Sequence, residues 1–155
     1  SLQEKADIAQ NAADLARALG VDRPKLAVLC ATESVNPAMP ATLDAAALSK
    51  MADRQQIRGG EIDGPLAFDN AISREAADQK GIVSRVAGDA DILLVPDIEA
   101  GNMLYKELTW LAGAGTAGLV LGTRVPVLLT SRSDSMQARV NSCAVASLYA
   151  RALAG

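Results

Sequence analysis

Short runs of apolar residues alternate along the chain with longer stretches in which apolar residues recur every three or four positions. The runs at residues 26–31 and 92–95 are too short for helices and too continuous for half-exposed strands, so they predict strands covered on both faces. Weaker apolar runs at residues 61–66, 117–121 and 125–129 also predict strands.

Helical spacing predicts an amphipathic helix at each end of the chain and three more between them. The first is expected to end at Gly20. Thr42, Asp69 and Ser135 are expected to cap the starts of three others, and one more helix is expected over residues 103–112. The apolar faces predicted for the first, second and last helices are Ile8, Ala12, Leu15 and Leu19; Leu43, Ala47 and Met51; and Val140, Ala144 and Leu148.

The alternation of strands and helices predicts an α/β fold with three layers, in which helices cover both faces of a mostly parallel sheet. Four polar turns each follow a predicted strand, and right-handed crossovers would place them at one edge of the sheet. They are residues 32–40, 64–69, 97–102 and 131–135. Because open α/β sheets bind ligands beyond the carboxyl ends of their strands, this edge is the expected ligand edge.

Composition narrows the class of function. The 155 residues suit one well-buried domain, and a formal net charge of −3 argues against binding to nucleic acid. The absence of histidine excludes a zinc cluster of the usual kind and a serine hydrolase triad. Cys30 and Cys143 are expected to be buried, reduced thiols. Residues 108–130 are apolar but broken by glycines, Arg124 and Pro126, so we expect no membrane span and a cytoplasmic protein.

Residues 113–118 match the pattern G-x-G-x-x-G, but they follow a helix and precede a strand, the reverse of the order in a dinucleotide-binding turn. We interpret them as a helix stop with close backbone packing.

Two turns carry candidate binding chemistry. Ser131 and Arg132 lie between a predicted strand and a helix N-terminus, where backbone N–H groups and a guanidinium suit an anion. Gly101 and Asn102 could present an N–H group and an amide to a ligand. A structural alternative exists for both turns, because the same residue types cap helices, and the residues alone leave both interpretations open.

Four segments of the chain resemble the phosphate acetyltransferase and phosphate butyryltransferase family, near the butyryl branch and the forms fused to an enoyl-CoA hydratase domain. The segments are V-N-P-A-M-P-A-T-L-D-A-A-A-L-S-K-M, D-G-P-L-A-F-D-N-A-I-S, A-D-I-L-L-V-P-D-I-E-A-G-N-M-L-Y-K and V-L-L-T-S-R-S-D-S. The resemblance covers residues 26–148 and implies a fold like that of isocitrate and isopropylmalate dehydrogenases, with two α/β domains in a homodimer. Residues 1–122 would be the second domain, and residues 123–155 would return to a first domain that this chain lacks. The chain alone is therefore expected to be inactive.

The implied reaction moves an acetyl, butyryl or similar acyl group between coenzyme A and phosphate, with coenzyme A as a substrate and no cofactor or metal. Ser131 would position the thiol or stabilise developing charge, and Arg132 would bind phosphate, with Gly101 and Asn102 as further contacts. The acetyl branch has a base aspartate seven positions after the serine, where this chain has Ala138, so Asp134 is the substitute candidate. The competing hypothesis is a non-catalytic domain that binds coenzyme A or acyl phosphate, or that forms the dimer surface of a larger fusion protein.

Overall fold

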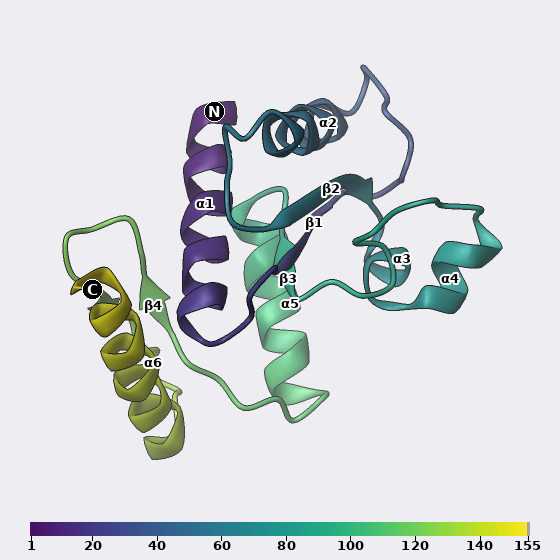
Figure 1. Ribbon diagram of the computed structural model, residues 1–155. Coiled ribbons are helices and arrows are strands. Elements are labelled where there is room, and N and C mark those ends of the chain that lie inside the picture. Colours follow the sequence, from purple (N-terminus) through teal and green to yellow (C-terminus); the bar gives the residue numbers. More distant parts are fainter. Residues whose placement is uncertain (155) are drawn as a thin grey trace.

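The computed structural model describes residues 1–154 as a sheet with helices packed on both of its faces (Figure 1). In chain order its elements are α1 (Leu2–Ala18), β1 (Lys25–Leu29), α2 (Pro40–Asp53), β2 (Glu61–Leu66), α3 (Phe68–Ile72), α4 (Arg74–Gln79), β3 (Ile92–Leu94), α5 (Ile98–Trp110), β4 (Leu119–Val120), β5 (Val127–Leu128) and α6 (Met136–Ala154).

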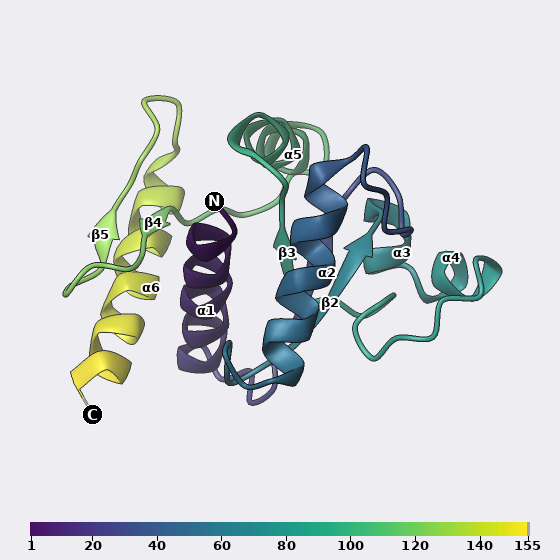
Figure 2. The same ribbon diagram turned by 90° about the horizontal axis from the view of Figure 1, so that it is seen from above.

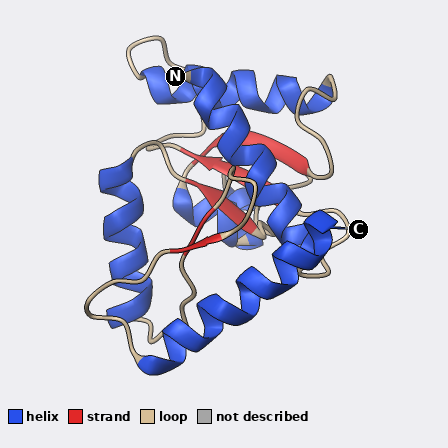
Figure 3. Ribbon diagram, turned by 90° about the vertical axis from the view of Figure 1, so that its left-hand side faces the viewer, coloured by secondary structure: helices blue, strands red, loops and turns tan. Residues whose placement is uncertain are grey.

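The two strands predicted from continuous apolar runs and the weaker strand predicted at residues 61–66 form one parallel sheet in the order β2-β1-β3. Helices α1 and α2 pack on one face around Leu26, Val28 and Leu48. Helices α3 and α4 cover the other face around Leu29 and Leu66, and α5 adds its Leu104 there. Figures 2 and 3 show the strands between these two helical layers. The predicted three-layer α/β fold with a parallel sheet is confirmed.

The first three polar turns meet at the carboxyl edge of this sheet, as predicted. Glu33, in the loop after β1, accepts hydrogen bonds from Asn70 Nδ2 at 3.4 Å and from Lys80 Nζ at 3.5 Å. Lys80 also donates to Asp69, and this hydrogen bond lowers the pKa of the Asp69 carboxyl and raises the pKa of Lys80. These contacts bind the loop after β1 to the turn after β2.

The prediction that the fourth turn shares this edge is wrong. Strands β4 and β5 do not join the parallel sheet but pair antiparallel with each other, Leu119 opposite Leu128 and Val120 opposite Val127. Each has only two residues, and the loop between them contains Pro126, which lacks the N–H group that a ladder needs. The turn at residues 131–135 therefore does not lie at the carboxyl edge of the parallel sheet.

The apolar faces predicted for three helices are only partly correct: Ala12 and Met51 pack against the core, but other residues, many of them alanine, fill the fully buried positions. Helix α1 buries Ala6, Ala9 and Ala13, whereas Ile8 is 52% exposed. Likewise α2 buries Ala45 and Leu48, and α6 buries Ala138, Ser142 and Tyr149 while Val140 is 55% exposed. Small side chains let a helix lie close to its neighbour, so close packing decides which face turns inward.

Three helix starts differ from the prediction, whereas that of α6 agrees with it. Helix α5 begins at Ile98, before the predicted residue 103. Helix α2 begins at Pro40, a residue favoured in the first helical turn, and the Thr42 hydroxyl instead donates to the carbonyls of Asn36 and Met39. The helix predicted to start at Asp69 is interrupted at Ser73, whose hydroxyl accepts the Ala76 N–H and starts α4.

The predicted stop at Gly20 is confirmed by its φ of +95°, a conformation that favours glycine. Ser135 is likewise confirmed as a cap, because its hydroxyl accepts the Ala138 N–H at 3.1 Å. The structural interpretation of residues 113–118 also holds. Gly113 has a φ of +65°, and a Cβ on Gly118 would lie 2.2 Å from the Leu129 carbonyl oxygen.

The two cysteines are both free, but they differ in burial. Cys30 is partly buried, and burial raises the pKa of its thiol. Cys143 lies exposed on α6, so the prediction that it is buried is wrong. Within residues 1–154, none of the helices has both the length and the apolar character needed to span a bilayer.

Candidate functional site

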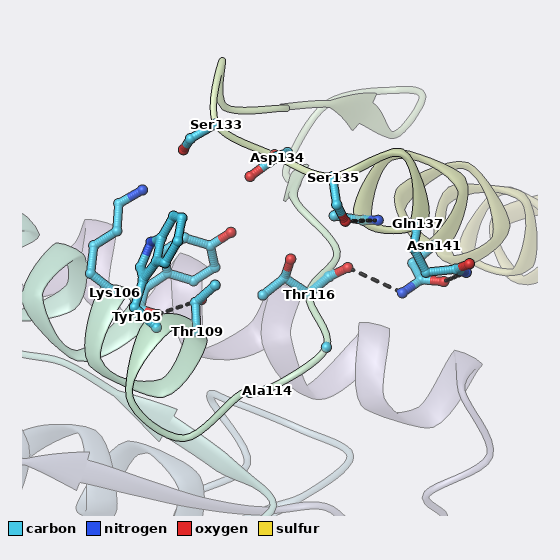
Figure 4. A pocket seen from close by; sticks show the side chains of 13 residues that line it. Tyr105, Lys106, Thr109, Ala114, Thr116, Ser133, Asp134, Ser135, Gln137 and Asn141 are labelled. Atoms are coloured by element: carbon cyan, nitrogen blue, oxygen red, sulfur yellow. Dashed lines mark hydrogen bonds between the residues drawn. The ribbon is translucent and has the colours of Figure 1, made fainter.

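The turn at residues 131–135 and the start of α6 face helix α5 across a pocket of about 220 Å³ (Figure 4). Tyr105, Lys106, Thr109 and Trp110 line it from α5. The opposite wall and the floor are made by Ala114, Gly115, Thr116, Ser133, Asp134, Ser135, Gln137, Ala138 and Asn141. Segments that are about 30 positions apart in the sequence thus form one site.

Asp134 holds the shape of the turn. Its Oδ2 atom accepts the Ser131 N–H at 2.6 Å, and the Ser131 hydroxyl lies 3.0 Å from the Ser133 hydroxyl. The Ser131 hydroxyl has no carboxylate or other base as a hydrogen-bond partner within residues 1–154. This geometry therefore does not activate Ser131 as a nucleophile. It does allow the hydroxyl to donate a hydrogen bond to a substrate.

The first turn of α6 supplies the electrostatic character of that wall. The first N–H groups of a helix lack partners within the helix and carry partial positive charge, so they favour an anion. The Ser135 hydroxyl satisfies the Ala138 N–H and so fixes where the helix begins.

Buried hydrogen bonds fix the floor of the pocket to α6. The Ser142 hydroxyl, with the residue only 1% exposed, accepts the Gly118 N–H at 2.9 Å and donates to the Ala138 carbonyl at 2.8 Å. Asn141 Nδ2 donates to the Thr116 carbonyl at 3.3 Å. The loop between α5 and β4 therefore keeps a defined position relative to α6.

The predicted site residues fall into two groups. Asp134 lines the pocket, whereas Ser131 and Arg132 lie in the same turn just outside the lining. Ser131 is half-buried and Arg132 is exposed, and Arg132 has no ion pair within residues 1–154. Gly101 and Asn102 lie in the first turns of α5, outside the pocket lining.

The structure gives Gly101 a packing role. Its N–H donates to the Asp97 carbonyl at 3.1 Å, and a Cβ at this position would lie 2.9 Å from Val95 Cγ2. The Asp97 side chain caps the same helix by accepting the Ala100 N–H at 2.8 Å. The Gly101 N–H is therefore already engaged within the helix, and substrate contact by Gly101 and Asn102 stays a prediction.

Comparison with known proteins identifies the family to which the chain belongs. The model of the family described as phosphate acetyl/butaryl transferase matches residues 1–147. The chain belongs to this family. It is 61% identical over 149 residues to the phosphate acetyltransferase of Rhizobium meliloti, covering 96% of this chain and 47% of that protein. It is 53% identical over 149 residues to the phosphate butyryltransferase of Clostridium acetobutylicum, covering 96% of this chain and 50% of that protein.

A solved structure agrees with the family. The branched-chain phosphotransacylase from Enterococcus faecalis V583 superposes with a TM-score of 0.87 at 40% identity, covering 97% of this chain and 54% of that one. The chain therefore spans about half the length of the relatives it matches. The relatives carry acetyl, butyryl and branched-chain names, so similarity identifies the family and leaves the acyl group to experiment.

Ala138 stands where the family resemblance led us to expect a base in the acetyl branch. This residue is 6% exposed and lines the pocket. A methyl group there cannot take a proton. Asp134 is the carboxylate that lines the pocket from the turn and the start of α6, since the remaining lining residues there are neutral.

The sequence interpretation missed the α5 side of this pocket. Asn102, Lys106 and Thr109 follow one another at spacings of four and three, so they share one face of α5. A lysine on the polar face of an otherwise apolar helix was the available signal. From the sequence alone this lysine did not indicate a site, because a solvated lysine is common on helix surfaces.

A second, apolar cavity of about 670 Å³ lies on another side of α5. Phe68, Val95, Met103 and Leu108 are among its lining residues, together with Cys30 at the end of β1. Its lining is mainly hydrocarbon, which suits an apolar group.

Proposed function

We propose that the protein transfers a short acyl group between coenzyme A and phosphate, so that acyl-CoA and phosphate give acyl phosphate and free coenzyme A. Family membership and the names of the relatives support this reaction. The observation that carries it is the Ser131–Arg132 turn at the N-terminus of α6, beside the pocket that Asp134 lines.

In the reverse direction, the thiolate of coenzyme A attacks the carbonyl carbon of the acyl phosphate. The carbon–sulfur bond forms, the carbon–oxygen bond to phosphate breaks, and phosphate leaves with the electron pair. The thiol has an ordinary pKa of about 8.5, so the site must remove its proton and stabilise an oxyanion. In our proposal Ser131 donates a hydrogen bond to the developing charge or the thiol, and Arg132 binds phosphate through its paired N–H groups.

Asp134 is our candidate for the proton acceptor. One of its oxygens is engaged by the Ser131 N–H, and its carboxylate lines the pocket. A carboxylate fixed in this way keeps its second oxygen for a substrate proton.

Asp134→Asn is expected to lower the transfer rate by about 10²-fold or more and to flatten the acid limb of the pH–rate profile. Asparagine keeps an oxygen that can accept the Ser131 N–H, so the turn should hold its shape while the proton acceptor is lost. The measurement is the rate at which the completed enzyme consumes free thiol from coenzyme A and butyryl phosphate between pH 5 and 9, the direction in which Asp134 accepts the proton. An unchanged rate and profile would remove Asp134 from the mechanism.

We further propose that residues 1–122 form one domain and residues 123–155 pack against further protein. Apolar side chains on the hairpin support this, because Val125, Val127 and Leu129 are exposed in the described chain. The exposed Met103 of α5 and Leu111, which directly follows that helix, similarly support a homodimer. Two unpaired cysteines are compatible with a reducing compartment such as the cytoplasm.

The 155-residue chain alone is expected to show little or no transfer activity, because it spans about half the length of its relatives. Completing it with the part of the Rhizobium meliloti enzyme that it does not match should restore phosphate-dependent thiol release from acetyl-CoA or butyryl-CoA. Comparing the two substrates in this assay also reports the acyl preference.

The matched control is the Rhizobium meliloti enzyme itself, assayed under the same conditions. A folded, completed protein with no transfer to phosphate would contradict the proposed reaction and favour a non-catalytic binding domain. Rapid turnover by the 155-residue chain alone would contradict the proposed need for further protein.

A further inference from the structure

Lys106 differs from every other lysine of the described chain. Lys5, Lys25, Lys50 and Lys80 each form an ion pair with at least one carboxylate. Lys106 has no carboxylate within 4.0 Å among residues 1–154. It is nevertheless half-buried rather than fully solvated.

Lys106 lies in the wall of the pocket between α5 and α6 described above. Its ammonium nitrogen lies 5.4 Å from the centre of the Tyr105 ring, and its side chain lines the wall formed by α5. Figure 4 shows it extending from α5 on the side of the pocket toward Ser133. An ammonium group that lines a pocket without a carboxylate partner is positioned to gain from an incoming anion.

We propose that Lys106 is a further substrate-binding residue, which holds a phosphate group from the α5 side while the first turn of α6 approaches it from the other side. The inference rests on the proposed function and adds a residue to that site. The Asn102–Lys106–Thr109 face connects the first turns of α5 to this position. Lys106 acts as a point charge, which suits a phosphate oxygen whose orientation is set by Arg132.

In the proposed reaction the phosphate group held by Lys106 has two possible sources. One source is inorganic phosphate or the acyl phosphate, and the other is the phosphate groups of coenzyme A. Titrations with inorganic phosphate, with coenzyme A and with coenzyme A lacking its 3′-phosphate distinguish them, since only the ligand held by Lys106 should lose affinity when the lysine is replaced.

Trp110 supplies the readout, because it is the one tryptophan of the chain and it lines the same pocket. Titration of the 155-residue chain should give a saturable change in its emission, with calorimetry as the second measure of binding. Lys106→Gln should raise the Kd for the ligand that it holds about 10- to 100-fold. Lys106→Arg keeps the charge and should bind within a few-fold of the unchanged protein.

Lys50→Gln is the matched control. It removes the same charge from an exposed ion pair with Asp53 on α2 and should leave the Kd unchanged. The inference is overturned if Lys106→Gln binds each ligand as well as the unchanged protein, or if calorimetry detects no binding of any of the three ligands.

Failure of this inference differs from failure of the proposed function. Transfer activity in the completed enzyme together with an unaffected Lys106→Gln variant would remove Lys106 alone. Phosphate binding that depends on Lys106, in a completed protein that transfers no acyl group, would remove the reaction and leave the anion site.

Discussion

Arg132→Ala is expected to lower the rate of acyl transfer to phosphate about 10²- to 10³-fold in the completed enzyme. The guanidinium is exposed and has no ion pair within residues 1–154, so its removal leaves no carboxylate unpaired and should not unfold the chain. In our proposal its paired N–H groups bind the phosphate, whose charge changes during the reaction. Steady-state rates at several phosphate concentrations measure the effect on kcat/KM for phosphate.

Two variants make this result specific. Arg151→Ala removes the same charge from an exposed position in the last turn of α6 and should keep nearly full activity. Arg132→Lys should recover only part of the rate, because an ammonium group cannot offer two parallel hydrogen bonds. Undiminished activity in Arg132→Ala would remove its phosphate role.

Leu94→Asp is expected to unfold the chain by costing about 4 kcal/mol or more. Leu94 lies on β3, is 8% exposed, and belongs to the core between the sheet and helices α1 and α2. A carboxylate there would be buried without a partner and would disrupt the layer that supports α5. Urea denaturation followed by circular dichroism measures the loss of stability.

The matched control for this variant is Val83→Asp. Val83 is 101% exposed, so the same new charge should change the free energy of unfolding by less than about 0.5 kcal/mol. A Leu94→Asp protein with an unchanged midpoint would mean that β3 is not central to the stability of the sheet.

The sheet was predictable because its signal is local. Four to six apolar residues in succession, as at 26–31 and 92–95, suit a strand buried between two helical layers. The cap at Asp97 and the glycine at Gly20 are equally local, since each acts through backbone geometry within one turn.

The helix faces were not predictable in the same way. In α1 alanine takes the inner face rather than the larger Ile8, whereas α6 buries Ala138, Ser142 and Tyr149, a set that no single apolar stripe indicates. Hydrophobic periodicity gives Ile8 more weight than Ala9, yet Ala9 is the residue that is fully buried. A helix that lies close to its neighbour has room only for a methyl group at the contact.

The candidate site lies between these two cases. Ser131, Arg132 and Asp134 were visible as a turn before a helix and through the family resemblance. Lys106 was not visible, because only the folded structure shows that it lines the pocket without forming an ion pair. The antiparallel pairing of β4 and β5 was also hidden, since a two-residue strand carries no information about its partner.

The separation of the hairpin and α6 from the parallel sheet has a consequence for motion. Helix α6 buries only three residues in the described chain, and β4 and β5 pair with each other rather than with β1, β2 or β3. Regions with few buried contacts open at a lower free energy than the global unfolding of a domain. The turn that carries Ser131 and Arg132 is therefore expected to open at a lower free energy than the three-stranded sheet.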